Sequence, residues 1–153
     1  MRSNRRAFTI IEILIVVMIV GILMAISLPK LGTTRVRLDA RAAQRRVASA
    51  LGQARALAIQ NGRSARFVLD GNVIKVVLEK NDGTWQSIVQ QDLSATEGVT
   101  VESTRDTLSF DPRGLALSNA GGTRIVITKG TYSDSVCVLG LGKILSDKCS
   151  LSQ

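Results

Sequence analysis

Glu12 is the one charged residue in an apolar run that extends from Phe8 to Leu28. As a helix this run would be roughly 31 Å long, about the thickness of the hydrocarbon core of a bilayer. A carboxylate at the centre of a bilayer costs on the order of 2 to 3 kcal/mol, so Glu12 requires a partner. The rest of the chain is interpreted around this acid.

The rest of the chain offers little that could support catalysis. It has no histidine, which removes Ser-His-Asp and Cys-His arrangements and most transition-metal sites. Its acids are scattered singly, without an Asp-x-Asp or Glu-x-x-Glu cluster for calcium binding or acid–base chemistry. Gly140–Lys143 has neither the spacing of a phosphate-binding loop nor a helix after it. We therefore predict a protein that is not an enzyme and that carries no cofactor and no metal ion.

Two cysteines, Cys137 and Cys149, lie near the C-terminus. An oxidising compartment would allow them to pair, and so small a loop would stabilise the fold by about 2 to 3 kcal/mol. The alternative is a pair of buried free thiols. Arg2, Arg5 and Arg6 precede the apolar run without an acid among them, a pattern that keeps the N-terminus in the cytoplasm and exports the remainder. Export would favour the disulfide.

The formal net charge of +8 is concentrated in one stretch of the chain. Between Lys30 and Arg66, Asp39 is the single acid among many arginines, whereas acids outnumber bases from Phe67 onward. Nucleic-acid binding through the high pI would have to use the basic stretch. A solvated helix face is the simpler explanation of that stretch.

The expected architecture begins with one long helix from about Phe8 to Gln60. Pro29 removes a backbone donor, so a kink or local loosening is expected there, and Gly21 is a second weak point. Beyond Gly32, apolar residues recur with the helical period and would form one buried stripe. The stripe comprises Val36, Ala40, Ala43, Val47, Ala50, Leu51, Ala54 and Ala58, and the residues predicted on the opposite side are Arg37, Arg41, Arg45 and Arg55.

From Ser64 onward the pattern changes to short runs of β-forming residues between turn residues, and no helix is expected after Asn61. The predicted strands are Ala65–Leu69, Val73–Leu78, Trp85–Val89, Val99–Glu102, Thr107–Phe110, Arg124–Thr128 and Ser135–Leu139. Asp70-Gly71-Asn72 joins the first two as a hairpin. The fold class is α+β, with a long N-terminal helix packed on an antiparallel β head.

The N-terminal residues resemble those of type IV prepilins and type II secretion pseudopilins. The resemblance rests on Arg5-Arg6, Ala7, Phe8-Thr9, Glu12 and Pro29, which fall where that family has its processing site, its acid and its helix-breaking proline. It implies cleavage between Ala7 and Phe8 by a membrane prepilin peptidase, followed by N-methylation of Phe8. The chain departs from the family at Ala7, where glycine is usual.

Glu12 gains a partner if the resemblance holds. Cleavage would create an α-ammonium on Phe8, and in a helical filament of such subunits the Glu12 carboxylate could meet the ammonium of its own chain or of a neighbour. Charge neutralisation in an apolar core would fix the register of the subunits. In this interpretation Phe8 and Glu12 serve processing and assembly.

Three further stretches look like the GspH/FimT branch of minor pilins and pseudopilins: Ala54–Gly62, Phe110–Gly114 and Gly142-Lys143-Ile144. Cysteines that embrace a glycine-basic motif are typical of FimT-like pilus members, and Cys137 and Cys149 embrace Gly142-Lys143. Some FimT-like pilins bind DNA through a glycine-arginine-x-arginine motif, but this chain has Lys143 and Leu145 at the arginine positions. DNA binding would rest on phosphate contacts without base readout, from Lys143, Lys148, Arg124 and Lys129.

The predicted domains are a leader (1–7), a transmembrane and filament-core helix (8–28), its amphipathic continuation (29–62) and a β-rich periplasmic head (63–153). The predicted function is that of a minor type IV pilin, held by a single pass in the bacterial inner membrane before it joins other pilins and helps to initiate or cap the pilus. The alternative is the H-type pseudopilin of type II secretion. A third is a secreted soluble binding domain released after Ser27, since Ala25-Ile26-Ser27 resembles a signal-peptidase site. The arginine pair also loosely resembles a twin-arginine export signal.

Overall fold

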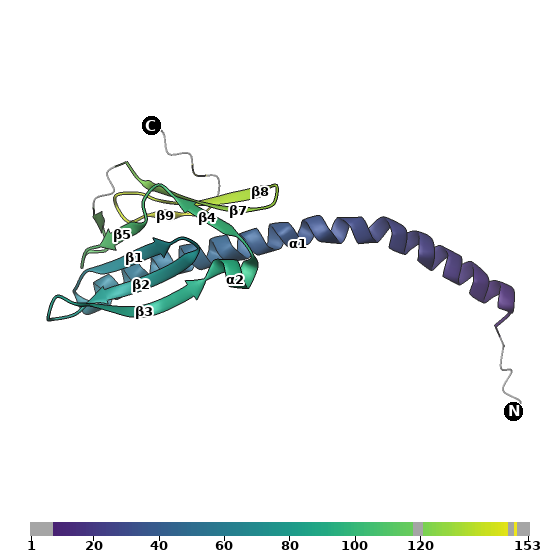
Figure 1. The fold of residues 1–153 in the computed structure, drawn as a ribbon, viewed down its shortest axis with the longest axis horizontal. Coiled ribbons are helices and arrows are strands. Elements are labelled where there is room, and N and C mark those ends of the chain that lie inside the picture. The colour runs from purple at the N-terminus through teal and green to yellow at the C-terminus, as the bar shows by residue number, and fades with distance from the viewer. Residues whose placement is uncertain (1–7, 118–120, 147–148, 150–153) are drawn as a thin grey trace, which may run out of the picture. The chain divides into compact units, whose positions relative to one another are not determined.

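The computed structural model describes residues 8–117, 121–146 and 149, with the side chains of 27–31 and 33 left out (Figure 1). The chain divides into two compact units, Met1–Arg35 and Val36–Gln153. Helix α1 (Ile10–Asn61) contributes residues to both. The two units are described separately below.

The first unit is the N-terminal part of α1. The Thr9 hydroxyl accepts a hydrogen bond from the backbone N–H of Glu12 at 3.3 Å, as an N-cap residue does. The helix therefore begins two residues later than predicted, and Phe8 precedes it. It is continuous through Gly21 and Pro29. Among the residues that the structure describes, no helix is both long and apolar enough to cross a membrane.

In the second unit, α1 buries the predicted stripe. Seven of its eight residues are buried, from Ala40 at 0% exposure to Ala58 at 0%, and Val36 is partly exposed. Arg37, Arg41 and Arg45 are exposed as predicted. The prediction for Arg55 was wrong: it is half-buried and its guanidinium reaches into the head. The helical period cannot separate such a residue from a solvated one, because a long side chain at the border of a stripe can turn either way.

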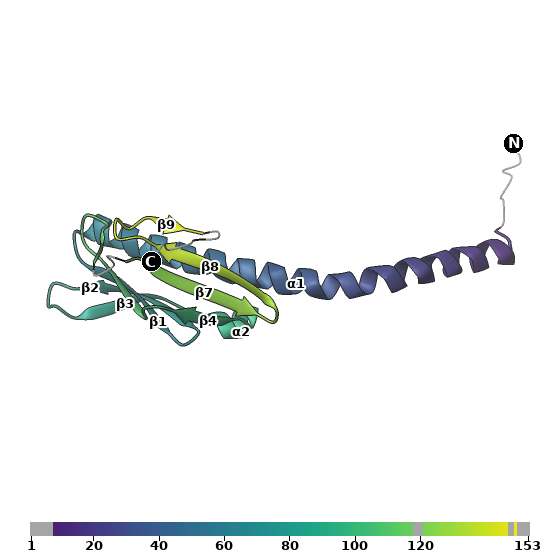
Figure 2. The same cartoon turned by 90° about the horizontal axis from the view of Figure 1, so that it is seen from above.

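The head contains two antiparallel sheets (Figures 1 and 2). The first has the order β3-β2-β1-β5-β6, and the second β4-β7-β8-β9. In chain order the strands of the first sheet are β1 (Ala65–Asp70), β2 (Val73–Glu79), β3 (Trp85–Asp92), β5 (Thr107–Phe110) and β6 (Ala116–Leu117). Those of the second are β4 (Thr100–Ser103), β7 (Thr123–Lys129), β8 (Tyr132–Val138) and β9 (Ile144–Leu145).

One core joins the helix to both sheets. The stripe residues from Ala43 to Ala58 pack in a single cluster with Phe67 and Phe110 of the first sheet and Ile125 and Val136 of the second. All four of these strand residues have 0% exposure. The alternating burial of β1 and β7 shows the period of two expected for strands with one covered face. The α+β prediction is confirmed.

The prediction that no helix follows Asn61 was wrong, because α2 (Leu93–Glu97) connects β3 to β4. The Asp92 carboxylate caps it by accepting from the backbone N–H groups of Ser94 and Ala95, and Gly98 ends it with a φ of 62°. Both caps are readable in the sequence. A helix of only five residues is too short to show an apolar period, which is why it was missed.

Cys137 and Cys149 form a disulfide, with an S–S distance of 2.03 Å and a Cα–Cα distance of 5.9 Å. Both residues are buried, Cys137 at the end of β8 and Cys149 beyond β9. The predicted pairing is confirmed. The disulfide therefore closes a loop of the chain that includes the turn with Gly142 and Lys143.

Replacing both cysteines with serine should lower the free energy of unfolding by about 2 to 3 kcal/mol, because the unfolded chain regains the entropy of an open loop. Thermal denaturation of the full chain in detergent, with and without reductant, measures this loss. The double variant should be insensitive to reductant. An equal melting temperature for oxidised and reduced wild-type protein would contradict the prediction.

Candidate functional site

The first candidate site is the apolar surface of the first unit. Its large apolar side chains are exposed on every side of the helix, from Phe8 at 74% through Val20 at 42% to Ile26 at 58%. Apolar surface of this extent marks contact with a membrane or another protein, since water solvates it poorly. Within the described residues, no other part of the chain buries the apolar surface of this unit.

Glu12 lies in the first turn of α1 and is exposed. The positive end of a helix dipole favours a carboxylate at this position. Thr9 and Glu12 also have the spacing of a capping box, so the start of this helix can be recognised in the sequence. The structure thus places Phe8 just before the first turn and Glu12 within it, while Ala7 lies outside the described residues. The predicted ion pair of Glu12 with a Phe8 ammonium stays a prediction.

The second candidate site is the pair of turns that lie against Arg55. Arg55 Nη1 donates to the carbonyl oxygen of Gly142 at 2.9 Å, and Arg55 Nε is buried without a hydrogen-bond partner among the described residues. A Cβ on Gly114 would lie 2.8 Å from Ile59 Cδ1 and 3.0 Å from Arg55 Nε. A Cβ on Gly142 would collide with the Gly114 carbonyl oxygen. The Arg55 hydrogen bond therefore ties the helix to the turn at Gly142. Glycine at positions 114 and 142 lets the two turns lie this close to each other and to Arg55.

These turns belong to two stretches singled out in the sequence, Phe110–Gly114 and Gly142-Lys143-Ile144. The Asp111 carboxylate shapes the first turn by accepting from the backbone N–H groups of Arg113 and Leu115. The structure brings the two stretches together through Arg55 and leaves Lys143 exposed on the turn before β9. No sequence signal identified their contact, because they are separated along the chain.

The structure describes three of the four predicted DNA contacts, Lys143 before β9 and Arg124 and Lys129 on β7. Lys129 Nζ pairs with Asp39 Oδ2 at 2.6 Å and also donates to the carbonyl oxygen of Glu97. Arg124 is exposed on β7, and Lys148 lies outside the described residues. DNA binding therefore gains no support from the structure.

A charge network around one buried acid went unpredicted. Glu97 is only 7% exposed, and its Oε1 lies 2.5 Å from Arg46 Nε of α1. Its carbonyl oxygen accepts from Lys129, which also pairs with Asp39. Leaving the buried Glu97 carboxylate unpaired would be costly, whereas the side chains of Arg46, Lys129 and Asp39 keep contact with solvent. The network attaches α2 and β7 to the helix.

Two turn carboxylates have lowered pKa values. The hydroxyl of Thr84 lowers the pKa of Asp82, and the hydroxyl of Ser94 lowers that of Asp92, each by donating a hydrogen bond to the charged form. Their stabilising effect is present above the unfolded pKa and is lost as the pH falls through the lower folded pKa. Both carboxylates are local caps. Among the described residues, no three His, Cys, Asp or Glu side chains gather as metal ligands would.

Comparison with protein families identifies the fold. Residues 43–142 match the model of the type II transport protein GspH, and residues 2–28 match the prokaryotic N-terminal methylation motif. The chain belongs to the GspH family. This family holds minor type IV pilins and pseudopilins, which are structural subunits, so the predicted family is confirmed.

Solved structures with the same fold come from both kinds of filament. The type IV minor pilin FimU of Pseudomonas aeruginosa is 15% identical, with a TM-score of 0.61 over 72% of this chain and 90% of FimU. The minor pseudopilin EpsH of the Vibrio cholerae type II secretion system is 13% identical, with a TM-score of 0.59 over 75% of this chain and 97% of EpsH. No curated protein matches the chain with significance. At these identities the likeness extends to the fold alone.

Gly142→Ala should destabilise this GspH-family head by more than the roughly 1 to 2 kcal/mol that a left-handed conformation costs a residue with a Cβ. The excess arises because the new methyl group would displace the Gly114 carbonyl from Arg55. Urea denaturation of the full chain in detergent measures the total loss in the free energy of unfolding.

Two glycines provide controls for this variant. Gly83→Ala isolates the cost of conformation, because Gly83 has a φ of 78° and nothing near its Cβ position. Gly121→Ala should be nearly neutral, because nothing lies near that position either and no positive φ is required there. Equal losses for Gly142→Ala and Gly83→Ala would show that the contact with Gly114 contributes nothing.

Proposed function

We propose that this chain is a minor type IV pilin that is cleaved between Ala7 and Phe8 and N-methylated on Phe8. The observation that carries the proposal is the methylation motif at residues 2–28 on a helix whose apolar side chains are exposed on every side. A subunit of this kind works by assembly with other pilins. It would help to initiate or cap the pilus.

The precursor would be held in the inner membrane by one pass of the apolar run from Phe8 to Leu28, with its head in the periplasm. The arginines before the run and the disulfide of the head both support export. The leader, residues 1–7, would stay on the cytoplasmic side, where a membrane prepilin peptidase removes it. The same run would then exchange lipid for the apolar helices of neighbouring subunits.

One observation favours a pilus over a type II secretion pseudopilus. The disulfide of Cys137 and Cys149 encloses the turn with Gly142 and Lys143, the arrangement typical of FimT-like members. The H-type pseudopilin remains the alternative function, since the fold is common to both filaments.

Chains recovered from sheared pili should begin with N-methyl-Phe8. Mass spectrometry of the mature N-terminus tests this, with unprocessed chains from a strain that lacks the prepilin peptidase as the control. A mature chain that begins at Leu28 would refute the pilin function in favour of the secreted domain. Absence from pili, combined with loss of exoprotein secretion on deletion, would establish the pseudopilin instead.

Glu12→Ala should leave cleavage at Ala7 intact and block incorporation into pili, because the Phe8 ammonium would lose its partner in an apolar core. Immunoblots of membrane and sheared fractions measure both steps. Glu102→Ala is the matched control, since Glu102 is an exposed acid of β4 in the head. Normal incorporation of the Glu12 variant would count against the ion pair.

A further inference from the structure

The end of the second unit at which α1 enters the head has an exposed surface of mixed character. Arg37 and Leu38 of α1 lie there, and the apolar Leu38 is 57% exposed. The turn between β7 and β8 lies beside them, since a Cβ on Gly130 would lie 3.9 Å from Val36 Cγ1. Tyr132 follows this turn and is partly exposed. We call Arg37, Leu38 and Tyr132 the entry surface.

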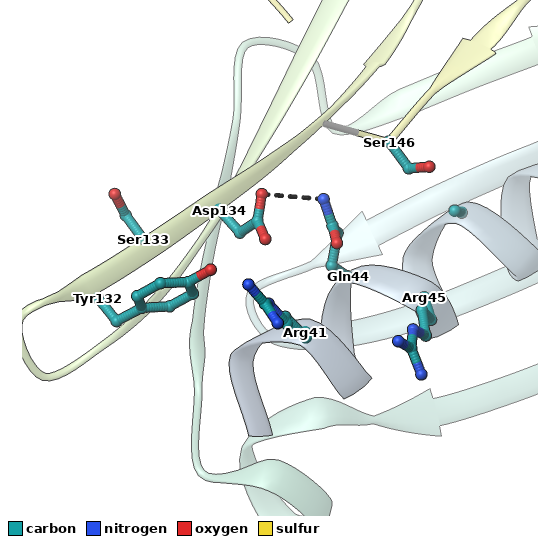
Figure 3. A pocket seen from close by; sticks show the side chains of 8 residues that line it. Arg41, Gln44, Arg45, Tyr132, Ser133, Asp134 and Ser146 are labelled. Atoms are coloured by element: carbon teal, nitrogen blue, oxygen red, sulfur yellow. Dashed lines mark hydrogen bonds between the residues drawn. The ribbon is translucent and has the colours of Figure 1, made fainter. Parts of the chain in front are cut away.

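The fold holds the parts of the entry surface together. Arg37 Cζ lies 5.9 Å from the centroid of the Tyr132 ring, a distance at which a guanidinium is attracted to the face of a ring. Figure 3 shows Tyr132 on β8 opposite α1, together with the hydrogen bond that joins these two elements nearby. In that bond Gln44 Nε2 donates to Asp134 Oδ1 at 2.9 Å. The strand therefore keeps Tyr132 beside the helix.

The charge of Arg37 faces solvent. Arg37 is exposed, and among the residues that the structure describes no carboxylate forms an ion pair with it. The acids on the adjoining elements are engaged with other groups: Asp39 with Lys129, Glu97 with Arg46, and Asp134 with Gln44. The entry surface therefore presents a cation that an anionic partner can approach.

The entry surface follows closely after the apolar run of the chain. That run ends at Leu28, and Arg37 comes nine residues later in the same helix, which corresponds to about 14 Å of helix. Side chains of a helix are tilted toward its N-terminus, so a long arginine side chain reaches back over part of this length. The head-group region of a bilayer extends roughly 5 to 8 Å beyond each side of the hydrocarbon core. The charge of Arg37 therefore comes within reach of the head groups around the run.

We infer that the entry surface rests on anionic lipid head groups while the precursor is held in the membrane. The guanidinium of Arg37 would bind lipid phosphate through paired hydrogen bonds. Leu38 would be removed from water in the same layer, and Tyr132 has the kind of amphipathic ring that is enriched at this depth. The inference rests on the proposed function, because the apolar run is what brings the bilayer to this surface.

The composition of the entry surface favours a bilayer over a nucleic acid. Arg37 alone could bind the phosphate of either partner. A nucleic acid is bound mainly by several cations that neutralise successive phosphates, and Leu38 would contribute nothing to such contacts. The head-group layer of a bilayer offers phosphate and apolar surroundings within a few ångströms of each other, and so has a use for all three residues.

The test uses the full chain with its disulfide, transferred from detergent into vesicles. A fluorophore is attached to the cysteine of Thr131→Cys, because Thr131 is exposed on the turn next to Tyr132, and a quencher is carried on the lipid head group. Vesicles of phosphatidylcholine with phosphatidylglycerol in both leaflets are compared with vesicles of phosphatidylcholine alone. We expect stronger quenching in the anionic vesicles, and we expect high salt to remove the difference.

Substitutions of the entry surface separate its charge from its apolar contact. Arg37→Glu should lower the ratio of docked to undocked heads in anionic vesicles roughly thirtyfold, because each unit of charge near such a surface changes this ratio about fivefold. Arg37→Lys should retain most of the docking, since the charge persists. Leu38→Ser should weaken docking without changing its salt dependence, because it removes apolar contact and no charge.

Two controls isolate the entry surface. Lys80→Glu reverses an exposed charge on the turn between β2 and β3 and should leave the quenching unchanged. Ala56→Cys carries the fluorophore at an exposed position of α1, about 27 Å of helix beyond Leu38, and should be quenched little in either kind of vesicle.

The outcomes distinguish this inference from the proposed function. If the chain resists carbonate extraction from the vesicles, but the fluorophore at Thr131 is quenched no more than at Ala56, the inference is overturned while the assembly function stands. The same holds if Arg37→Glu is quenched as strongly as the parent. If carbonate removes the parent chain from the vesicles, the membrane-held precursor and the inference fail together.

Discussion

The packing of α1 against both sheets is the constraint on which the second unit depends. Most residues of the buried stripe are alanines, and Ala43, Ala54 and Ala58 have no exposed surface at all. Because these side chains are small, Phe67 and Phe110 of the first sheet supply much of the volume that fills the core. A larger residue in the stripe would have to displace its neighbours in this packed core.

Polar residues at the border of the stripe connect the helix to the head. A polar group that is buried there must find a partner inside the protein. Gln44 bonds β8, the buried Glu97 pairs with the partly exposed Arg46, and Arg55 reaches Gly142. These three contacts anchor the second sheet, α2 and the C-terminal turn to one helix. The glycines at 114 and 142 complete the arrangement, because a Cβ at either would meet Arg55 or the facing turn.

The sequence predicted what depends on local pattern. The stripe from Ala40 to Ala58, the hairpin of β1 and β2 and the β5 strand lie where the apolar periods and turn residues placed them. It did not predict contacts between distant segments. Arg55 was predicted on the solvent side of the helix, because periodicity describes a backbone position and not the direction of a long side chain. The short strands β6 and β9 have two residues each, too few for any period to be visible. Of the candidate site, the disulfide could be predicted from the sequence, and the processing residues stay a prediction, whereas the Gly114–Gly142 contact required the fold.

The two parts of α1 solve the same problem in opposite ways. After Val36 the helix covers its apolar stripe with its own sheets, and its exposed side is charged. Before Arg35 the apolar residues extend around the whole helix, which no single packed face could bury. At roughly 25 cal/mol per Å² of apolar surface, such a helix gains most from surroundings that cover every side. Lipid and a bundle of like helices both meet that need, and under the proposed function a bundle would also bring a cation to Glu12. The first turn of a helix is where the dipole makes a carboxylate least costly, so Glu12 lies at the position of α1 where a charge in apolar surroundings costs least.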